Sequence, residues 1–140
     1  MSVNDSIGRG DFIGLQTAST TEAINPGLIV EVDSNGDVVL PTTTPGKPIG
    51  VAATKVDSRT TASKEDIVVQ VSGLAHIKCA ANEGFSVNDL VGVGAGGVAT
   101  TYGSVAGTTF GSENLRSIVG RCIIPDATTE GTTVVVLLGL

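Results

Sequence analysis

The 140-residue sequence contains one pattern of apolar and turn-forming residues twice. The matched positions are Val30 with Val91, Gly50 with Gly120, and Leu74 with Leu140, at offsets of 61, 70 and 66 residues. These offsets differ only by insertions in loops. Two copies are too few for a solenoid, in which three or more units stack in series. The pattern therefore predicts that two duplicated β units, about residues 25–74 and 87–140, fold together into one domain.

The residue types favour an all-β fold. Aromatic residues make up 3% of the chain and Trp is absent, so the core must consist of Val, Ile, Leu and Ala. The 19 Gly and several Thr pairs supply turn residues and β-branched strand residues. No segment keeps an apolar stripe at helical spacing over ten or more residues. The sequence therefore predicts a small all-β domain, folded as a β-barrel or a sandwich.

Alternating apolar and polar residues place the expected strands. Val30 and its neighbours at i±2 share one face, and Asn35-Gly36 is a strong hairpin signal. Ser72-Gly73 predicts a break or bulge in a long apolar segment, where a barrel would turn a corner. The expected strands lie at residues 28–32, 38–40, 49–55, 67–78, 90–93, 118–124 and 133–138.

Residues 1–22 differ from the rest of the chain. They mix turn-forming residues with isolated apolar ones and lack the alternation of the later strands. We therefore expect an extended N-terminal arm over residues 1–22 and a single β domain over residues 23–140. Because spaced apolar side chains favour a surface on which to lie, the arm is a candidate binding segment. Its candidate contact residues are Val3, Ile7, Phe12, Ile13 and Leu15.

The charge distribution argues against two classes of partner. The formal net charge is −6, and the Lys and Arg residues are scattered, so the sequence offers no basic face for the phosphates of nucleic acid. The longest apolar run, residues 134–138, is far too short to cross a membrane as a helix, and the N-terminus lacks signal-peptide regions. We therefore expect neither a nucleic acid nor a membrane as partner, and assembly in a host cytoplasm. In such a reducing compartment Cys79 and Cys122 are expected to be buried thiols, although a disulfide remains open if their strands are neighbours.

Two segments resemble ligand-binding motifs but lack the context that these motifs need. Residues 92–97 match G-x-G-x-x-G after a strand, yet the residues that follow do not favour the helix that would hold a pyrophosphate. Asp33, Asn35 and Asp37 have the opening spacing of a calcium loop, but the next glycine and the final glutamate are missing. Both segments are expected to be hairpin turns. No cofactor is expected.

Catalytic residues are scarce in the sequence. His76 is the single histidine, so no pair of histidines offers a metal site, and no Ser or Cys lies in a recognisable nucleophile motif. The tripeptide Arg9-Gly10-Asp11 has the letters of an adhesion motif, but no other feature indicates an extracellular protein. We therefore do not expect an enzyme, and expect no catalytic or metal-binding residues.

The order of the spaced glycines and apolar strands in residues 25–140 resembles the capsid decoration, or cement, proteins of tailed bacteriophages. The resemblance is carried by Ile49-Gly50-Val51-Ala52, the strands 68–75 and 87–91, the segment 97–100, Ile118-Val119-Gly120-Arg121-Cys122 and residues 134–138. It implies a β-barrel or β-tulip protein, often a homotrimer, that binds the outside of the head and staples neighbouring major capsid proteins. The expected location is then the outer capsid surface of the virion, with the major capsid protein as partner and the arm reaching across the shell.

Two other functions stay open at the level of sequence. One is a carbohydrate-binding or adhesion module of a phage tail or cell surface, for which the aromatics that could stack on sugars are Tyr102, Phe12, Phe85 and Phe110. The other is a small oligomeric β enzyme that uses His76. Both are alternatives to a capsid-binding function.

Overall fold

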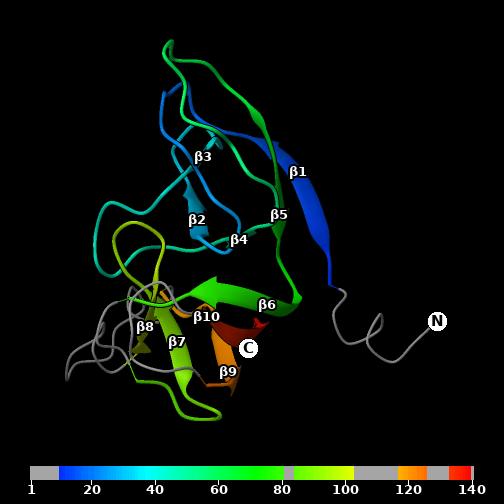
Figure 1. Cartoon of the computed structure of the whole chain (residues 1–140), viewed down its shortest axis with the longest axis vertical. Helices are drawn as coiled ribbons and strands as arrows, with labels where there is room; N and C mark the ends of the chain where they lie inside the picture. Colours follow the sequence, from blue (N-terminus) through cyan, green and yellow to red (C-terminus); the bar gives the residue numbers. More distant parts are fainter. Residues whose placement is uncertain (1–9, 81–83, 103–116, 126–132, 140) are drawn as a thin grey trace.

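The computed structural model describes residues 10–80, 84–102, 117–125 and 133–139, which fold into two antiparallel sheets (Figure 1). The first sheet has the order β1-β5-β4-β2-β3 and the second β6-β10-β9-β7-β8. The strands of the first sheet are β1 (Phe12–Gln16), β2 (Ile29–Val32), β3 (Val38–Val39), β4 (Gly50–Ala52) and β5 (Asp66–Gln70). Those of the second are β6 (Gly73–Lys78), β7 (Leu90–Val93), β8 (Ala99–Thr101), β9 (Gly120–Ile124) and β10 (Thr133–Leu138). The predicted all-β fold is confirmed.

The two sheets repeat one topology, strand for strand. Val30 lies opposite Gly50 in the first sheet, and Val91 lies opposite Gly120 in the second. Further across each sheet, Ala52 lies opposite Val69, and Cys122 opposite Val136. The predicted duplication therefore extends to the strand register. We call residues 10–71 the first unit and residues 72–139 the second unit.

Each sheet curls until its two edge strands meet at one point. Thr17, directly after β1, forms a parallel bridge with Val38 of β3, and Cys79, directly after β6, forms the same bridge with Ala99 of β8. The amide that follows each bridge donates to the opposite edge, from Ala18 to the Val38 carbonyl and from Ala80 to the Ala99 carbonyl. Both units are therefore small barrels that are closed at one point.

Matched turns start the second strand of each unit. Gly27 has φ 92°, and Asn88, at the equivalent position, has φ 72°. Both backbone amides donate to equivalent carbonyls of the neighbouring strand, Gly27 to Ala52 and Asn88 to Cys122. Because glycine and asparagine tolerate this left-handed conformation better than other residues do, the sequence can differ while the turn is retained.

Two apolar clusters fill the units. The first cluster lies inside the first unit, with Leu15, Leu40, Ile49 and Val71 packed at its border. Its buried members are Ile24, Val30, Val38, Ala52, Val56, Ile67 and Val69. The second cluster fills the second unit but also takes in Ile29 and Val51 of the first unit. These two side chains share one core with the second unit, so the units pack directly against each other.

The structure corrects the expected arm. Phe12–Gln16 is strand β1, and it pairs antiparallel with β5 over its whole length. The prediction that residues 1–22 lie outside the β domain is therefore wrong for β1. The reason is that β1 is an edge strand with exposed residues on both faces, so its sequence shows no alternation. Residues 1–9 lie outside the described residues.

The structure also corrects the point in the sequence at which each repeated unit begins. Gln70 and Leu137 hold equivalent positions in β5 and β10, opposite Val51 and Arg121. Phe12 lies opposite Gln70 and Leu74 lies opposite Leu137, so the counterpart of Leu74 is Phe12. The predicted match of Leu74 with Leu140 was wrong for that reason. Each unit begins with its edge strand, so the long strand predicted over residues 67–78 divides at the predicted break into β5, which ends the first unit, and β6, which begins the second. Strand β8 was not among the expected strands.

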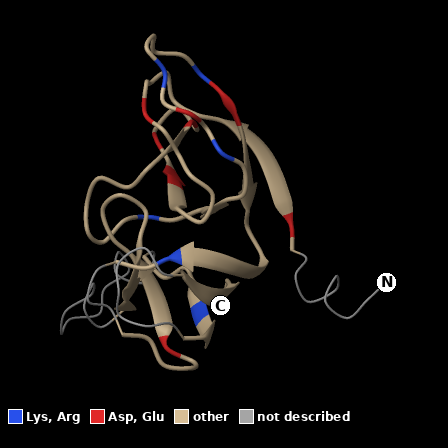
Figure 2. Ribbon diagram, in the orientation of Figure 1, with Lys and Arg blue, Asp and Glu red and all other residues tan. Residues whose placement is uncertain are grey.

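Charged side chains gather on the first unit (Figure 2). Among the described residues of the second unit, the charged ones are Lys78, Asp89 and Arg121. The described surface of the second unit is thus weakly charged.

Candidate docking surface

Strand β1 presents an open edge of main-chain groups. The Val71 amide donates to the Asp11 carbonyl, and the Thr17 amide donates to the Glu65 carbonyl at 2.8 Å, so odd-numbered residues exchange hydrogen bonds with β5. In an antiparallel pair the alternate residues point the other way. The amides and carbonyls of Phe12, Gly14 and Gln16 therefore face away from β5, at the edge of the sheet.

The side chains of β1 include two of the exposed large apolar residues of the chain. Phe12 is 49% exposed and Ile13 is 40% exposed. Leu15 instead packs against the core of the first unit. Of the five predicted contact residues, the structure thus brings Phe12 and Ile13 to the surface and uses Leu15 in the fold. Val3 and Ile7 lie outside the described residues.

A second apolar surface covers the outer face of the second sheet. Leu137 of β10 is 45% exposed, and Ile124 of β9 is 58% exposed. Arg121 lies opposite Leu137 on this face, and Ile123 is also exposed. Val87, in the turn before β7, is 57% exposed. Sequence analysis missed this surface because an apolar residue on the outer face of a strand looks the same in sequence as one that points into the core.

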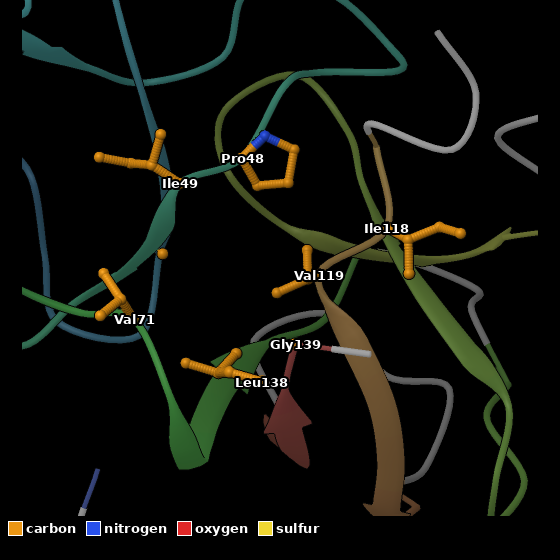
Figure 3. Close-up of a pocket in the computed structure, with 8 residues that line it drawn as sticks. Pro48, Ile49, Val71, Ile118, Val119, Leu138 and Gly139 are labelled. Carbon is orange, nitrogen blue, oxygen red and sulfur yellow. The ribbon is translucent and has the colours of Figure 1, made fainter. Parts of the chain in front are cut away.

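A pocket of about 170 Å³ lies between the two units (Figure 3). Its walls come in equivalent pairs, because the first unit contributes Pro48, Ile49 and Val71 and the second contributes their counterparts Ile118, Val119 and Leu138. Gly50 and Gly139 complete the lining, so no titratable side chain lines it. No side chain of the lining can therefore act as an acid or base.

The described residues gather no group of side chains that could hold a metal ion. No cluster of three or more His, Cys, Asp or Glu side chains gathers within residues 10–80, 84–102, 117–125 and 133–139. His76 lies exposed on β6. No helix in the described part of the chain is long and apolar enough to cross a membrane.

Both cysteines are buried, and they are not joined by a disulfide. Burial raises the pKa of the Cys122 thiol above its ordinary value, and the nearby Asp89 carboxylate raises it further. Because the thiolate is the reactive form, these surroundings disfavour redox or nucleophilic chemistry. The expected buried thiols are confirmed.

The resemblances to ligand-binding motifs have structural explanations. Residues 94–97 form the hairpin turn between β7 and β8, where the Gly94 amide donates to the Val98 carbonyl. Asp33 Oδ1 accepts hydrogen bonds from the amides of Asn35 and Asp37 at 2.9 and 3.0 Å, which is an Asx turn. The Asp11 amide donates to Ser72 Oγ, and Arg9 lies outside the described residues.

Comparison with known proteins identifies a structural relative. The base of the head fibre protein gp8.5 of bacteriophage phi29 shares the fold with a TM-score of 0.56. The alignment covers 92% of this chain and 95% of the other, at 12% sequence identity. No protein-family model matches the sequence, and no curated protein is similar to it. The likeness therefore concerns the fold, over nearly the full length of both chains.

Proposed function

We propose that this chain is a structural protein of a phage virion that binds the outer surface of the head and staples neighbouring major capsid proteins. One observation carries the proposal: the fold matches the base of a phage head fibre over 92% of the chain. The sequence resemblance to capsid decoration proteins points to the same location. A structural role also agrees with the buried cysteines and with a pocket whose lining has no titratable side chain.

The physical requirements of head binding suit this chain. A capsid offers many copies of one site, so an oligomer that contacts several sites gains avidity even where each contact is weak. We propose a homotrimer for this reason. The net charge of −6 helps to keep a protein made in many copies soluble in the host cytoplasm until it docks.

The N-terminal region is the proposed attachment to the shell. Val3 and Ile7 precede β1 and supply apolar side chains, whereas Leu15 anchors the start of the described chain to the first unit. Phe12 and Ile13 lie between these two groups and are exposed, so they are available to a neighbouring copy of the chain, whereas Val3 and Ile7 are the residues proposed to contact the shell itself. An extended segment beside an open strand edge can add main-chain hydrogen bonds to a neighbouring protein.

The alternative, a carbohydrate-binding or adhesion module, is less well supported. Sugar sites usually stack the sugar on exposed aromatic rings. Phe85 is 7% exposed and Tyr102 is 6% exposed, so both rings belong to the interior. Phe12 is the exposed aromatic among the described residues, and Phe110 lies outside them. A single ring on an edge strand provides a poor platform.

Binding to heads assembled without this chain tests the proposal. Heads from a phage in which this gene is deleted are mixed with the purified protein and sedimented. We expect saturable co-sedimentation, and we expect the loaded heads to withstand heating better than the bare ones. Heads that bind none of the protein, while a glycan array binds it, would favour the carbohydrate alternative.

A further inference from the structure

The contact between the two units is not reciprocal. The Lys78 amide of β6 donates to the Gly27 carbonyl at 3.0 Å, so the turn before β2 covers the outer edge of β6. In the reverse contact, the second unit would dock on the edge of the first. The residues equivalent to Lys78 and Gly27 in that contact are Gln16 of β1 and Asn88 of the turn before β7. Both are exposed, and β1 lies in the upper part of the view in Figure 1 whereas β7 lies in the lower part. Because of the duplication, each unit has one docking face and one docking edge. Within the chain, the face of the first unit contacts the edge of the second, and the other face and edge stay uncovered.

Burial at equivalent positions shows what the edge of β1 lacks. Ala75 and Ile77 of β6 are 2% and 0% exposed. Their counterparts in β1, Ile13 and Leu15, are 40% exposed and half-buried. The difference arises because the first unit packs on the second, whereas no described part of the chain packs on β1 in the same way.

The complementary surface in the first unit is the outer face of its sheet. Ile29 and Val51 of this face are 0% and 3% exposed because they share the core of the second unit. The register gives their counterparts in the second unit as Leu90 and Arg121. Arg121 is exposed and Leu90 is half-buried. Leu137, the counterpart of buried Gln70, is 45% exposed.

Exposed apolar side chains concentrate on these two uncovered surfaces. Seven large apolar residues of the described chain are exposed. Phe12 and Ile13 lie on β1, and a second group lies on or beside the outer face of the second sheet. That group consists of Val87, Ile123, Ile124 and Leu137. Val32, the seventh, belongs to neither surface. Adjoining exposed apolar side chains indicate an interaction site.

We propose that these surfaces bind each other in neighbouring copies of the chain. The outer face of the second sheet and the 86–89 turn of one copy dock on the β1 edge of the next, as the first unit docks on the β6 edge within one chain. The Asn88 carbonyl then accepts from the Gln16 amide of the next copy, as Gly27 accepts from Lys78. Arg121 replaces Val51 at this contact, and the exposed carboxylates of Asp11 and Asp66 flank β1. The intermolecular contact therefore has an ionic component that salt weakens.

A contact of this kind is heterologous, so each copy has one donor face and one acceptor edge. Such contacts close into a ring when the rotation permits and form a filament when it does not. A three-membered ring would give the homotrimer proposed above. The inference thus deepens the proposed oligomer, and it does not require binding to a capsid.

Two variants that each lose one surface test the inference. The edge variant is Phe12→Ser with Gly14→Pro; the Gly14 amide points away from β5, and a Cβ at Gly14 meets no atom within 4 Å. The face variant is Leu137→Ser with Arg121→Ser. The matched control is Val32→Ser, which removes an apolar side chain of similar exposure, 40%, from neither surface. Circular dichroism checks that each variant is folded.

Sedimentation velocity of the full chain over a range of concentrations gives the outcome. We expect self-association to weaken at least about tenfold in either variant, which corresponds to the loss of about 1.4 kcal/mol, and to be unchanged in Val32→Ser. An equal mixture of the two variants retains one intact contact per pair, so it should form dimers that do not grow further. Variants that associate like the natural chain, a mixture that stays monomeric, or a natural chain that is itself monomeric would overturn the inference. Failure to bind heads with association intact would instead contradict the proposed function alone.

Discussion

Two glycines determine how closely neighbouring strands approach in each unit. A Cβ at Gly50 would lie 2.3 Å from the Gln70 carbonyl oxygen, and a Cβ at Gly120 would lie 2.0 Å from the Leu137 carbonyl oxygen. These carbonyls belong to equivalent positions of β5 and β10. Glycine is thus required twice for the same steric reason, which is why the pair stands out in the sequence.

Replacing either glycine by alanine should destabilise the protein. The backbone must move to admit the methyl group, so we expect Gly50→Ala and Gly120→Ala each to lower the free energy of unfolding by about 1–3 kcal/mol. Gly14→Ala is the matched control, because its Cβ meets open space. Urea denaturation measures all three variants. Equal stability of Gly50→Ala and Gly14→Ala would contradict the close approach.

The buried thiol of Cys122 predicts a dependence of stability on pH. Its pKa is raised in the folded state, first by burial and then by Asp89, from the ordinary value of 9.0. As the pH rises above 9.0, the unfolded chain loses the proton first, so stability is full below that pH and falls until the folded thiol also ionises. Denaturation of the natural chain and of Cys122→Ala between pH 7 and pH 10.5 measures the effect. The part of the decline that is due to Cys122 should vanish in the variant, and identical slopes would contradict the prediction.

At the scale of elements, the sequence predicted strands well where turn-forming residues bound a run of apolar, mostly β-branched residues. Residues 90–93 and 133–138 were predicted with the bounds that the structure has for β7 and β10. Strand β1 was missed because Phe12 and Ile13 are adjacent, apolar and both exposed, which removes the period of two. The docking face of the second sheet was missed because exposure depends on tertiary packing. Phe12 and Ile13 were found as contact residues because an apolar side chain in a polar segment is conspicuous even when its strand is not recognised.

Strand β1 should be required for the stability of the first unit. Deleting residues 2–20 removes β1 and leaves the edge of β5 unpaired, so we expect a lower thermal midpoint and aggregation. Deleting residues 2–9 leaves all β1 pairing in place and should change the midpoint little. Thermal unfolding followed by circular dichroism compares the two. A stable, soluble protein without residues 2–20 would mean that β1 is dispensable, as an arm would be.

The guanidinium group of Arg59 links several carbonyls in and beside the 57–65 loop. Arg59 donates to the carbonyls of Thr20, Ser63 and Asp57, and its Nε lies 3.8 Å from Glu65 Oε1. Because its side chain is 12% exposed, the bonds to the Thr20 and Ser63 carbonyls are partly shielded from water, whereas the bond to Asp57 is exposed. We expect Arg59→Lys to lower the free energy of unfolding by about 1–3 kcal/mol, since the ammonium group cannot replace the planar set of donors.

A nearby surface ion pair provides the control for Arg59. Lys55 Nζ lies 3.2 Å from Asp57 Oδ1, but both side chains are more than half exposed, at 62% and 79%. We expect Lys55→Gln to change stability by less than about 0.5 kcal/mol. Urea denaturation compares the two. Similar losses in both variants would contradict a special role of the planar Arg59 donors.

At the scale of the whole molecule, the duplication explains both the fold and the proposed assembly. One unit packs its outer face on the edge strand of the other, and this leaves one uncovered face and one uncovered edge. These surfaces carry six of the seven exposed large apolar side chains of the described chain. A protein built in this way is suited to join copies of itself on a repetitive lattice, which is what a capsid provides.

The central claim is that this chain lies on the outside of a phage head, and difference imaging tests it most directly. Heads assembled from the same phage genome, with and without an intact copy of this gene, are compared by electron cryomicroscopy. We predict extra density on the outer surface of the head, at repeated positions over the junctions of neighbouring capsid proteins, into which the two-unit fold fits. Heads without such density, or density restricted to the tail, would contradict the claim.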